Sequence, residues 1–138
     1  MALIFVVDDE PLLLNLVSTM LRSDGHEVRS ATDAEGAIKA IRASQPPVEL
    51  IITDTDMKPL SGPHMVKQLH RMRIKCPVLF MSGNHGIAGM LADAAHSKAV
   101  IEKPFTATVL RLAIHKSLAA QMRKTHRATL SPESIASE

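Results

Sequence analysis

The sequence predicts an α/β fold in which helices cover both faces of a parallel β-sheet. Short apolar runs, typical of parallel strands buried on both faces, alternate with segments whose apolar residues recur at helical spacing. Five strands alternate in this way with five helices. The length of 138 residues is that of a single ordinary domain.

The first half of the chain contains two strands and two helices. The run Leu3–Val7 is predicted as the first strand. The first helix begins at Pro11, because proline suits a first helical turn, and ends at Asp24-Gly25. The second strand is predicted over His26–Ala31. The motif Thr32-Asp33-Ala34-Glu35 has the pattern of a capping box and should open the second helix.

The second half contains three further strands and three further helices. The strands are predicted at the apolar runs Leu50–Ile52, Val78–Met81 and Ala99–Ile101. The helices are predicted to begin at Gly62-Pro63, to cover Ile87–Ala95, and to begin at Phe105. The apolar periodicity is lost after about Thr125, so we expect one domain over residues 1–125 and a short flexible tail over residues 126–138.

The composition argues against several classes of protein. No apolar run reaches the roughly 20 residues of a membrane helix, and the N-terminus lacks the basic segment of a signal peptide. The single cysteine, Cys76, excludes an internal disulfide framework and suits a reducing compartment, so we expect a cytoplasmic protein without membrane contact. Direct nucleic-acid binding is not expected, because the net charge is only +2 and Trp and Tyr are absent.

Polar residues follow four of the five predicted strands. In doubly wound sheets ligands bind beyond the carboxyl ends of the strands, so we expect these side chains to converge. They are Asp8, Asp9, Asp54, Asp56, Ser82 and Lys103.

This set of side chains suits the transfer of a phosphoryl group. Carboxylates gathered so closely repel one another unless a cation lies between them, and ligands that are all oxygen favour Mg²⁺. A lysine and a hydroxyl suit the oxygens of a phosphoryl group, and a carboxylate between the metal and the lysine could attack phosphorus.

Four motifs together resemble the receiver domain of two-component response regulators. They are Asp8-Asp9, Asp54-x-x-Met57 with Gly62 eight residues after Asp54, Met81-Ser82-Gly83 and Lys103-Pro104-Phe105, and the match runs from about Leu3 to about Lys124. The resemblance implies a flavodoxin-like, doubly wound, five-stranded parallel sheet of order 2-1-3-4-5, with five helices on its two faces. It also implies a signalling domain rather than a turnover enzyme, here without an output domain.

The resemblance assigns the metal ligands and the phosphoacceptor. Asp54 would accept the phosphoryl group and would bind Mg²⁺ together with Asp9. Asp56 would contribute its main-chain carbonyl to the metal, and Asp8 would act largely through water.

The resemblance also assigns the groups that bind the phosphoryl oxygens. Lys103 would pair with the phosphoryl group, and the Lys103–Pro104 peptide bond would be cis. Ser82 would be the switch hydroxyl, aided by the main-chain amides of Thr55 and Gly83.

Two positions depart from the family pattern. Lys58 stands where the family usually has proline, with Pro59 directly after it, which adds a positive charge near the site. Val100 stands where the family commonly has an aromatic residue that rotates on activation, so a coupled serine–aromatic switch should not operate in the usual way.

The predicted function is phosphorelay signalling. The donor would be a sensor histidine kinase or a histidine phosphotransfer protein, and the output would be altered binding of a downstream protein that the sequence does not identify. A homodimer through the fourth helix, the fifth strand and the last helix is possible on this interpretation.

Two alternatives stay open at this point. Lys58 and Val100 allow a receiver-like binding module that works without phosphorylation. The motif Asp54-Thr55-Asp56 resembles the nucleophile motif of haloacid-dehalogenase-type phosphatases. That motif normally follows the first strand, however, and the chain has no room for a cap domain.

Overall fold

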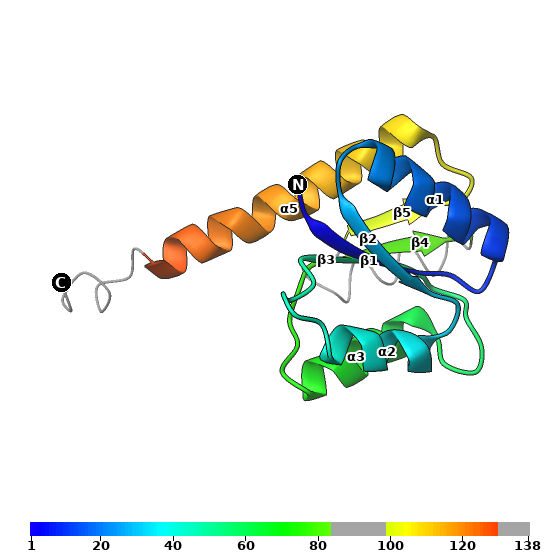
Figure 1. The fold of residues 1–138 in the computed structure, drawn as a ribbon, viewed down its shortest axis with the longest axis horizontal. Coiled ribbons are helices and arrows are strands. Elements are labelled where there is room, and N and C mark those ends of the chain that lie inside the picture. The colour runs from blue at the N-terminus through cyan, green and yellow to red at the C-terminus, as the bar shows by residue number, and fades with distance from the viewer. Residues whose placement is uncertain (84–98, 130–138) are drawn as a thin grey trace.

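The computed structural model describes residues 1–83 and 99–129. Its centre is a parallel sheet with the strand order β2-β1-β3-β4-β5 (Figure 1). The strands are β1 (Leu3–Val7), β2 (Glu27–Ala31), β3 (Leu50–Asp54), β4 (Val78–Ser82) and β5 (Ala99–Glu102). The predicted flavodoxin-like sheet is therefore confirmed, including its order.

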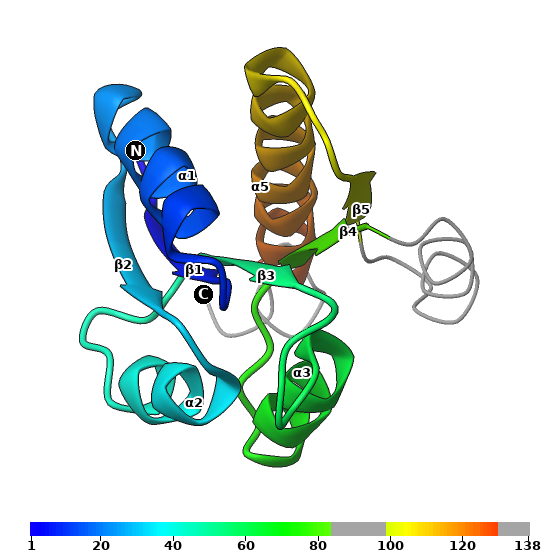
Figure 2. The same ribbon diagram turned by 90° about the vertical axis from the view of Figure 1, so that its right-hand side faces the viewer.

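Four helices lie within the described ranges, and they cover both faces of the sheet. Helices α1 (Pro11–Ser23) and α5 (Ala107–Thr129) lie on one face, and α2 (Ala34–Arg42) and α3 (Gly62–Arg71) lie on the other (Figure 2). The fifth predicted helix, over residues 87–95, lies outside the described residues. Helix α5 continues past residue 125, where the sequence placed the end of the domain, and reaches beyond the sheet (Figure 1).

The start of α2 differs from the sequence prediction by one residue. A capping box would make Thr32 the N-cap, but the N-cap is Asp33, whose carboxylate accepts a hydrogen bond from the Gly36 amide at 2.6 Å. Asp is a strong N-cap residue and accepts the amide three positions on, so Asp33 satisfies the first turn by itself. Glu35 lies in that first turn, where a negative charge also favours the helix N-terminus.

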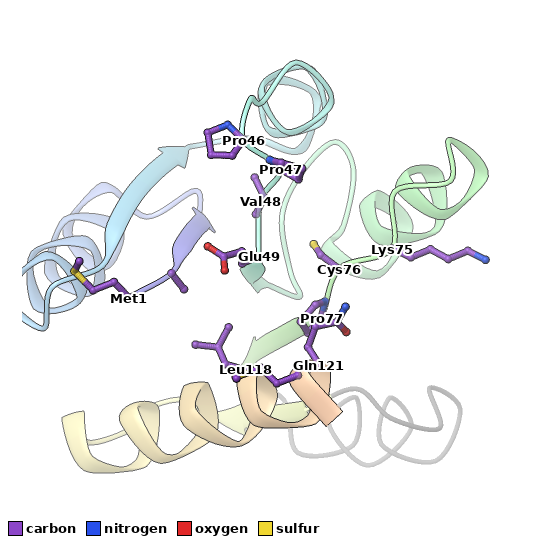
Figure 3. Close-up of a pocket in the computed structure, with 12 residues that line it drawn as sticks. Met1, Pro46, Pro47, Val48, Glu49, Lys75, Cys76, Pro77, Leu118 and Gln121 are labelled. Carbon is purple, nitrogen blue, oxygen red and sulfur yellow. The ribbon is translucent and has the colours of Figure 1, made fainter. Parts of the chain in front are cut away.

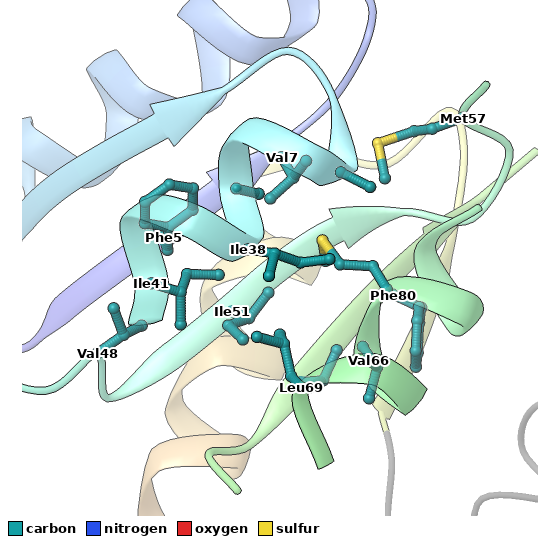
Figure 4. Close-up of a cluster of buried hydrophobic side chains, with 14 of the residues drawn as sticks. Phe5, Val7, Ile38, Ile41, Val48, Ile51, Met57, Val66, Leu69 and Phe80 are labelled. Carbon is teal, nitrogen blue, oxygen red and sulfur yellow. The ribbon is translucent and has the colours of Figure 1, made fainter. Parts of the chain in front are cut away.

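Alternate residues of the strands build two apolar cores. Phe5 and Val7 of β1 belong to the cluster beneath α2 and α3 (Figure 4), whereas Ile4 and Val6 belong to the cluster beneath α1 and α5. This division follows from the period of two in a strand. Because β1, β3 and β4 are buried along their whole length, only the ends of these strands can present polar groups.

Within the described residues, none of the helices is both long enough and apolar enough to cross a bilayer.

Candidate functional site

The sheet brings the predicted polar residues to one place, the carboxyl end of its strands. Asp8 directly follows β1, Asp54 is the last residue of β3, Ser82 is the last residue of β4, and Lys103 directly follows β5. Parallel pairing places all four strand ends on the same side of the molecule.

Three carboxylates form the centre of this site. Asp8, Asp9 and Asp54 each offer an oxygen atom, and these oxygens all lie within 4.8 Å of one another. Asp8 is completely buried and Asp54 is 4% exposed, whereas Asp9 is exposed to solvent. Asp56 is exposed, and its main-chain amide lies 3.4 Å from Oδ1 of Asp54.

Lys103 forms ion pairs with two of the carboxylates. Its Nζ lies 3.2 Å from Oδ1 of Asp54 and 3.4 Å from Oδ2 of Asp8. Burial alone would lower the pKa of Lys103, but the charges of Asp54 and Asp8 outweigh burial and raise the pKa above its ordinary value. The amine therefore stays protonated and is available to an anionic group. The Lys103–Pro104 bond is cis, and the Lys103 amide donates to the Ser82 carbonyl at 2.7 Å.

Asp8 is a buried acid, and its neighbours offset part of the effect of burial on its pKa. Burial raises its pKa, while the hydrogen bond from the Glu10 amide, at 2.9 Å, and the charge of Lys103 oppose that rise. The nearby charge of Asp54 raises the pKa further. An additional cation between Asp8 and Asp54 would relieve both the burial cost and the repulsion.

The main-chain amide of Thr55, which was predicted to aid the switch hydroxyl, has a partner in the sheet of this structure. It donates to the Met81 carbonyl at 3.0 Å, which extends the pairing of β3 with β4 by one residue. The next amide, that of Asp56, is the one beside the Asp54 carboxylate. The Thr55 amide is therefore engaged in the sheet, and the register of β3 against β4, which a single sequence does not reveal, decides this.

Two residues of the site were not assigned a role from the sequence. Oε1 of Glu10 lies 3.8 Å from Nζ of Lys103, so a third acid competes for the lysine. Gly62 begins α3 so close to β3 that a Cβ atom there would lie 2.2 Å from the Asp54 carbonyl oxygen. The position of Glu10 directly after Asp8-Asp9 was a usable signal. Gly62 marked the start of a helix and belonged to one of the four family motifs, but neither observation revealed its close approach to Asp54.

The comparison with protein families identifies the family of this chain. The family described as "Response regulator receiver domain" matches residues 4–115. This chain belongs to that family. The matched range includes the acid cluster, the buried serine and the lysine, and neither alternative is favoured by the comparisons.

Curated relatives of this receiver domain are response regulators. It is 32% identical over 112 residues to the probable transcriptional regulatory protein TcrX of Mycobacterium tuberculosis, covering 79% of this chain and 47% of TcrX. It is 33% identical over 118 residues to the nitrogen assimilation regulatory protein NtrX of Azorhizobium caulinodans, covering 83% of this chain and 26% of NtrX. The chain therefore spans a quarter to a half of the length of these relatives.

Solved structures give the same assignment. NtrX from Brucella abortus superimposes with a TM-score of 0.83 at 31% identity, covering 94% of this chain and 30% of that one. A receiver domain protein from Clostridium thermocellum superimposes with a TM-score of 0.79 at 24% identity, covering 88% of this chain and 98% of that one, and shows the shared fold.

The two departures from the family pattern lie in different environments. Lys58 is exposed in the loop after β3, directly after Met57, which is buried in the core beneath α2 and α3 (Figure 4). Val100 is half-buried on β5 and packs against the same core. Met57 thus anchors the loop, and Lys58 adds its charge on the solvent side.

Proposed function

We propose that this receiver domain accepts a phosphoryl group on Asp54 from a histidine kinase or a histidine phosphotransfer protein. The observation that carries the proposal is the position of the Asp54 carboxylate, 3.2 Å from Nζ of Lys103 and within 4.8 Å of the Asp8 and Asp9 carboxylates. Asp54 is the one acid that contacts the lysine from the end of the central strand β3.

The reaction would be a displacement at phosphorus. An oxygen of the ionised Asp54 carboxylate forms the new O–P bond, and the N–P bond to the donor imidazole breaks. The electron pair of that bond goes to the imidazole nitrogen, which then takes a proton. With acetyl phosphate as donor, the O–P bond breaks instead and acetate leaves. Lys103 stays protonated throughout and offsets the charge of the phosphoryl oxygens.

The carboxylates of Asp8, Asp9 and Asp54 fit Mg²⁺, because they form a close set of oxygen donors whose mutual repulsion a hard cation would neutralise. Bound there, Mg²⁺ would supply electrostatic stabilisation of the negatively charged phosphoryl oxygens. Asp9 and Asp54 would bind it directly, Asp8 through water, and Asp56 through its main-chain carbonyl.

The remaining contacts would hold the phosphoryl group after transfer. Ser82 is fully buried at the end of β4 and would reach the group as the switch hydroxyl. The Gly83 amide, and the Asp56 amide in place of that of Thr55, would donate to its oxygens.

The output we propose is a change in affinity for a downstream protein. Residues 1–125 would act as the receiver, in the cytoplasm, as a signalling domain rather than a turnover enzyme. The fifth strand and the last helix could support a homodimer, as the family resemblance implies.

The test is the intact mass after incubation with acetyl phosphate, with and without Mg²⁺. We expect one phosphoryl adduct on the wild type that requires Mg²⁺ and is absent from Asp54→Asn. The matched control is Asp33→Asn, which changes an acid outside the site and should be labelled like the wild type. An adduct that persists in Asp54→Asn would reject this assignment, and no adduct at all would favour the module that works without phosphorylation.

A further inference from the structure

The surface at the C-terminal ends of α2 and α3 is rich in positive charge. Both helices follow parallel strands and return the chain to the amino end of the sheet, so their last turns lie on the same side of the molecule (Figure 2). Six exposed cations lie there, and we call them the cationic patch: Lys39 and Arg42 of α2, Lys67 and Arg71 of α3, and Arg73 and Lys75 after α3. The sequence contains neither Asp nor Glu from residue 57 to residue 92.

The cations of the patch are not used to stabilise the fold through ion pairs. Within residues 1–83 and 99–122, ion pairs involve Arg29, Lys103 and Arg111, and none involves a member of the cationic patch. Elsewhere in the described chain, by contrast, exposed cations do find carboxylates, as Arg111 does with Asp24 at 2.8 Å.

Helix dipoles explain only part of the patch. Cations in the last turn of a helix interact favourably with its C-terminus, which accounts for Arg42 and Arg71. The effect falls off beyond the terminal turn, so it does not account for Arg73 and Lys75, which follow the end of α3.

Arg73 occupies a position where glycine would be conformationally better. Helices α1 and α3 end in the same way: the amide two residues after the C-cap donates to the carbonyl three residues before the cap, from His26 to Leu21 in α1 and from Ile74 to Leu69 in α3. The residue between has a positive φ in both, +93° at Gly25 and +64° at Arg73. Arginine there is conformationally disfavoured, which points to a role for its side chain.

The patch borders an apolar pocket. The pocket, of about 1030 Å³, lies at the amino end of the sheet, where residues preceding β1, β3 and β4 line it together with α5 (Figure 3). Lys75 lies at its rim with its amine pointing away, next to Cys76 and Pro77, which face inward (Figure 3). Met72, within the patch, is 41% exposed. Arginine and methionine beside apolar surface are typical of protein–protein contacts.

We propose that the cationic patch is a docking surface for an acidic segment of a partner protein that also carries apolar side chains. Carboxylates of the segment would pair with the unpaired cations, and its apolar side chains would cover Met72 and enter the pocket. Nucleic acid fits less well, because the chain has no Trp or Tyr on which bases could stack. The docking contacts would not include Asp54, which lies at the opposite end of the sheet.

The test is fluorescence anisotropy with a short labelled peptide of glutamate and leucine residues. Its counterpart with glutamine for glutamate, a labelled DNA duplex and anionic phosphatidylglycerol vesicles serve as comparison probes. The variant is Arg73→Gly, and Lys116→Ala removes the same charge from an exposed position of α5. We expect Arg73→Gly to weaken acidic-peptide binding about fivefold, and Lys116→Ala less than about twofold.

The same variant separates docking from folding. Because glycine relieves the positive φ, Arg73→Gly should raise the melting temperature by about 3 °C while it weakens binding. Equal weakening by Arg73→Gly and Lys116→Ala would overturn the proposal, as would tighter binding of the DNA or the vesicles than of the acidic peptide. Failure of the acidic peptide to bind, or equal binding of its glutamine counterpart, would overturn it too.

Discussion

The two ends of the parallel sheet differ in how they treat charge. At the carboxyl end, Lys103 lies within 4.0 Å of three acids, and two of the carboxylates there are almost completely buried. At the amino end, the six cations of the patch are exposed and have no carboxylate partner within the described chain. Between the two ends, β1, β3 and β4 are uniformly buried.

The difference shows that one fold can place reactive groups at one end of the sheet and a surface for partner binding at the other. Buried charges are strongly coupled and respond to a small ligand, because the effective dielectric constant around them is low. Exposed charges are screened and contribute little to stability, so they can be exchanged between partners at small cost to the fold. Substitutions at the carboxyl end should therefore change stability and phosphorylation together, whereas removal of a charge at the amino end should leave phosphorylation unchanged.

The largest effect is expected at Gly62. A methyl group there would lie 2.2 Å from the Asp54 carbonyl oxygen, which is backbone and cannot move aside freely. Gly62→Ala should therefore lower the free energy of unfolding by about 3 kcal/mol, measured by urea denaturation, and slow the phosphorylation of Asp54. Gly83→Ala is the matched control for stability, since no atom of the described residues lies within 4 Å of a Cβ there. Equal destabilisation by the two variants would remove the close approach as the cause.

The reactivity of the Cys76 thiol is a test of the environment at the amino end of the sheet. Burial raises its pKa from 9.0 to about 11, so the folded protein should hold about 100-fold less thiolate than the unfolded chain at mildly alkaline pH. Alkylation by iodoacetamide, followed by mass spectrometry, should be slower by about that factor in the folded state. A cysteine placed at the exposed Ser23 in a Cys76→Ser background should react at a rate close to that of the unfolded chain. Fast labelling of native Cys76 would contradict the raised pKa of this half-buried thiol.

At Asp8 we expect a substitution to stabilise the fold, unlike Gly62→Ala, and by a smaller amount. Burial raises the pKa of Asp8, so the folded state binds a proton more tightly than the unfolded chain does. Stability therefore falls as pH rises from the unfolded pKa, near 3.8, through the raised folded pKa, and ionised Asp8 disfavours folding at neutral pH. Without Mg²⁺ at pH 7, Asp8→Asn should stabilise the fold, and this gain should vanish below pH 3.8.

The stability of the Asp8 variant should also be compared with and without Mg²⁺. The wild type should be stabilised by Mg²⁺ in thermal denaturation, and Asp8→Asn should be stabilised less. Asp33→Asn is the control, because asparagine caps a helix as well as aspartate does and should leave both the stability and the Mg²⁺ response near those of the wild type. Destabilisation of the protein by Asp8→Asn at neutral pH would mean that the Lys103 contact outweighs burial.

The sequence was sufficient for features that repeat locally. Strand runs and helical spacing predicted all five strands, and the family resemblance implied the sheet order. The topological rule then predicted that Asp8, Asp54 and Lys103 lie together. It was insufficient where a contact depends on packing between elements. The engagement of the Thr55 amide depends on the register of two strands, and the close approach of Gly62 depends on how α3 sits on β3. The cationic patch combines the ends of two helices that are separated by a whole strand.

Helix α3 connects the two ends of the sheet mechanically. Its first residue, Gly62, is packed against the Asp54 carbonyl with no space to spare, and its last turn carries Arg71 of the patch. A helix of 10 residues is a stiff rod about 15 Å long, so a shift of the backbone at Asp54 cannot be absorbed within its first turn. Such a shift would tilt the rod and displace its far end, which makes α3 a lever between the two ends of the sheet.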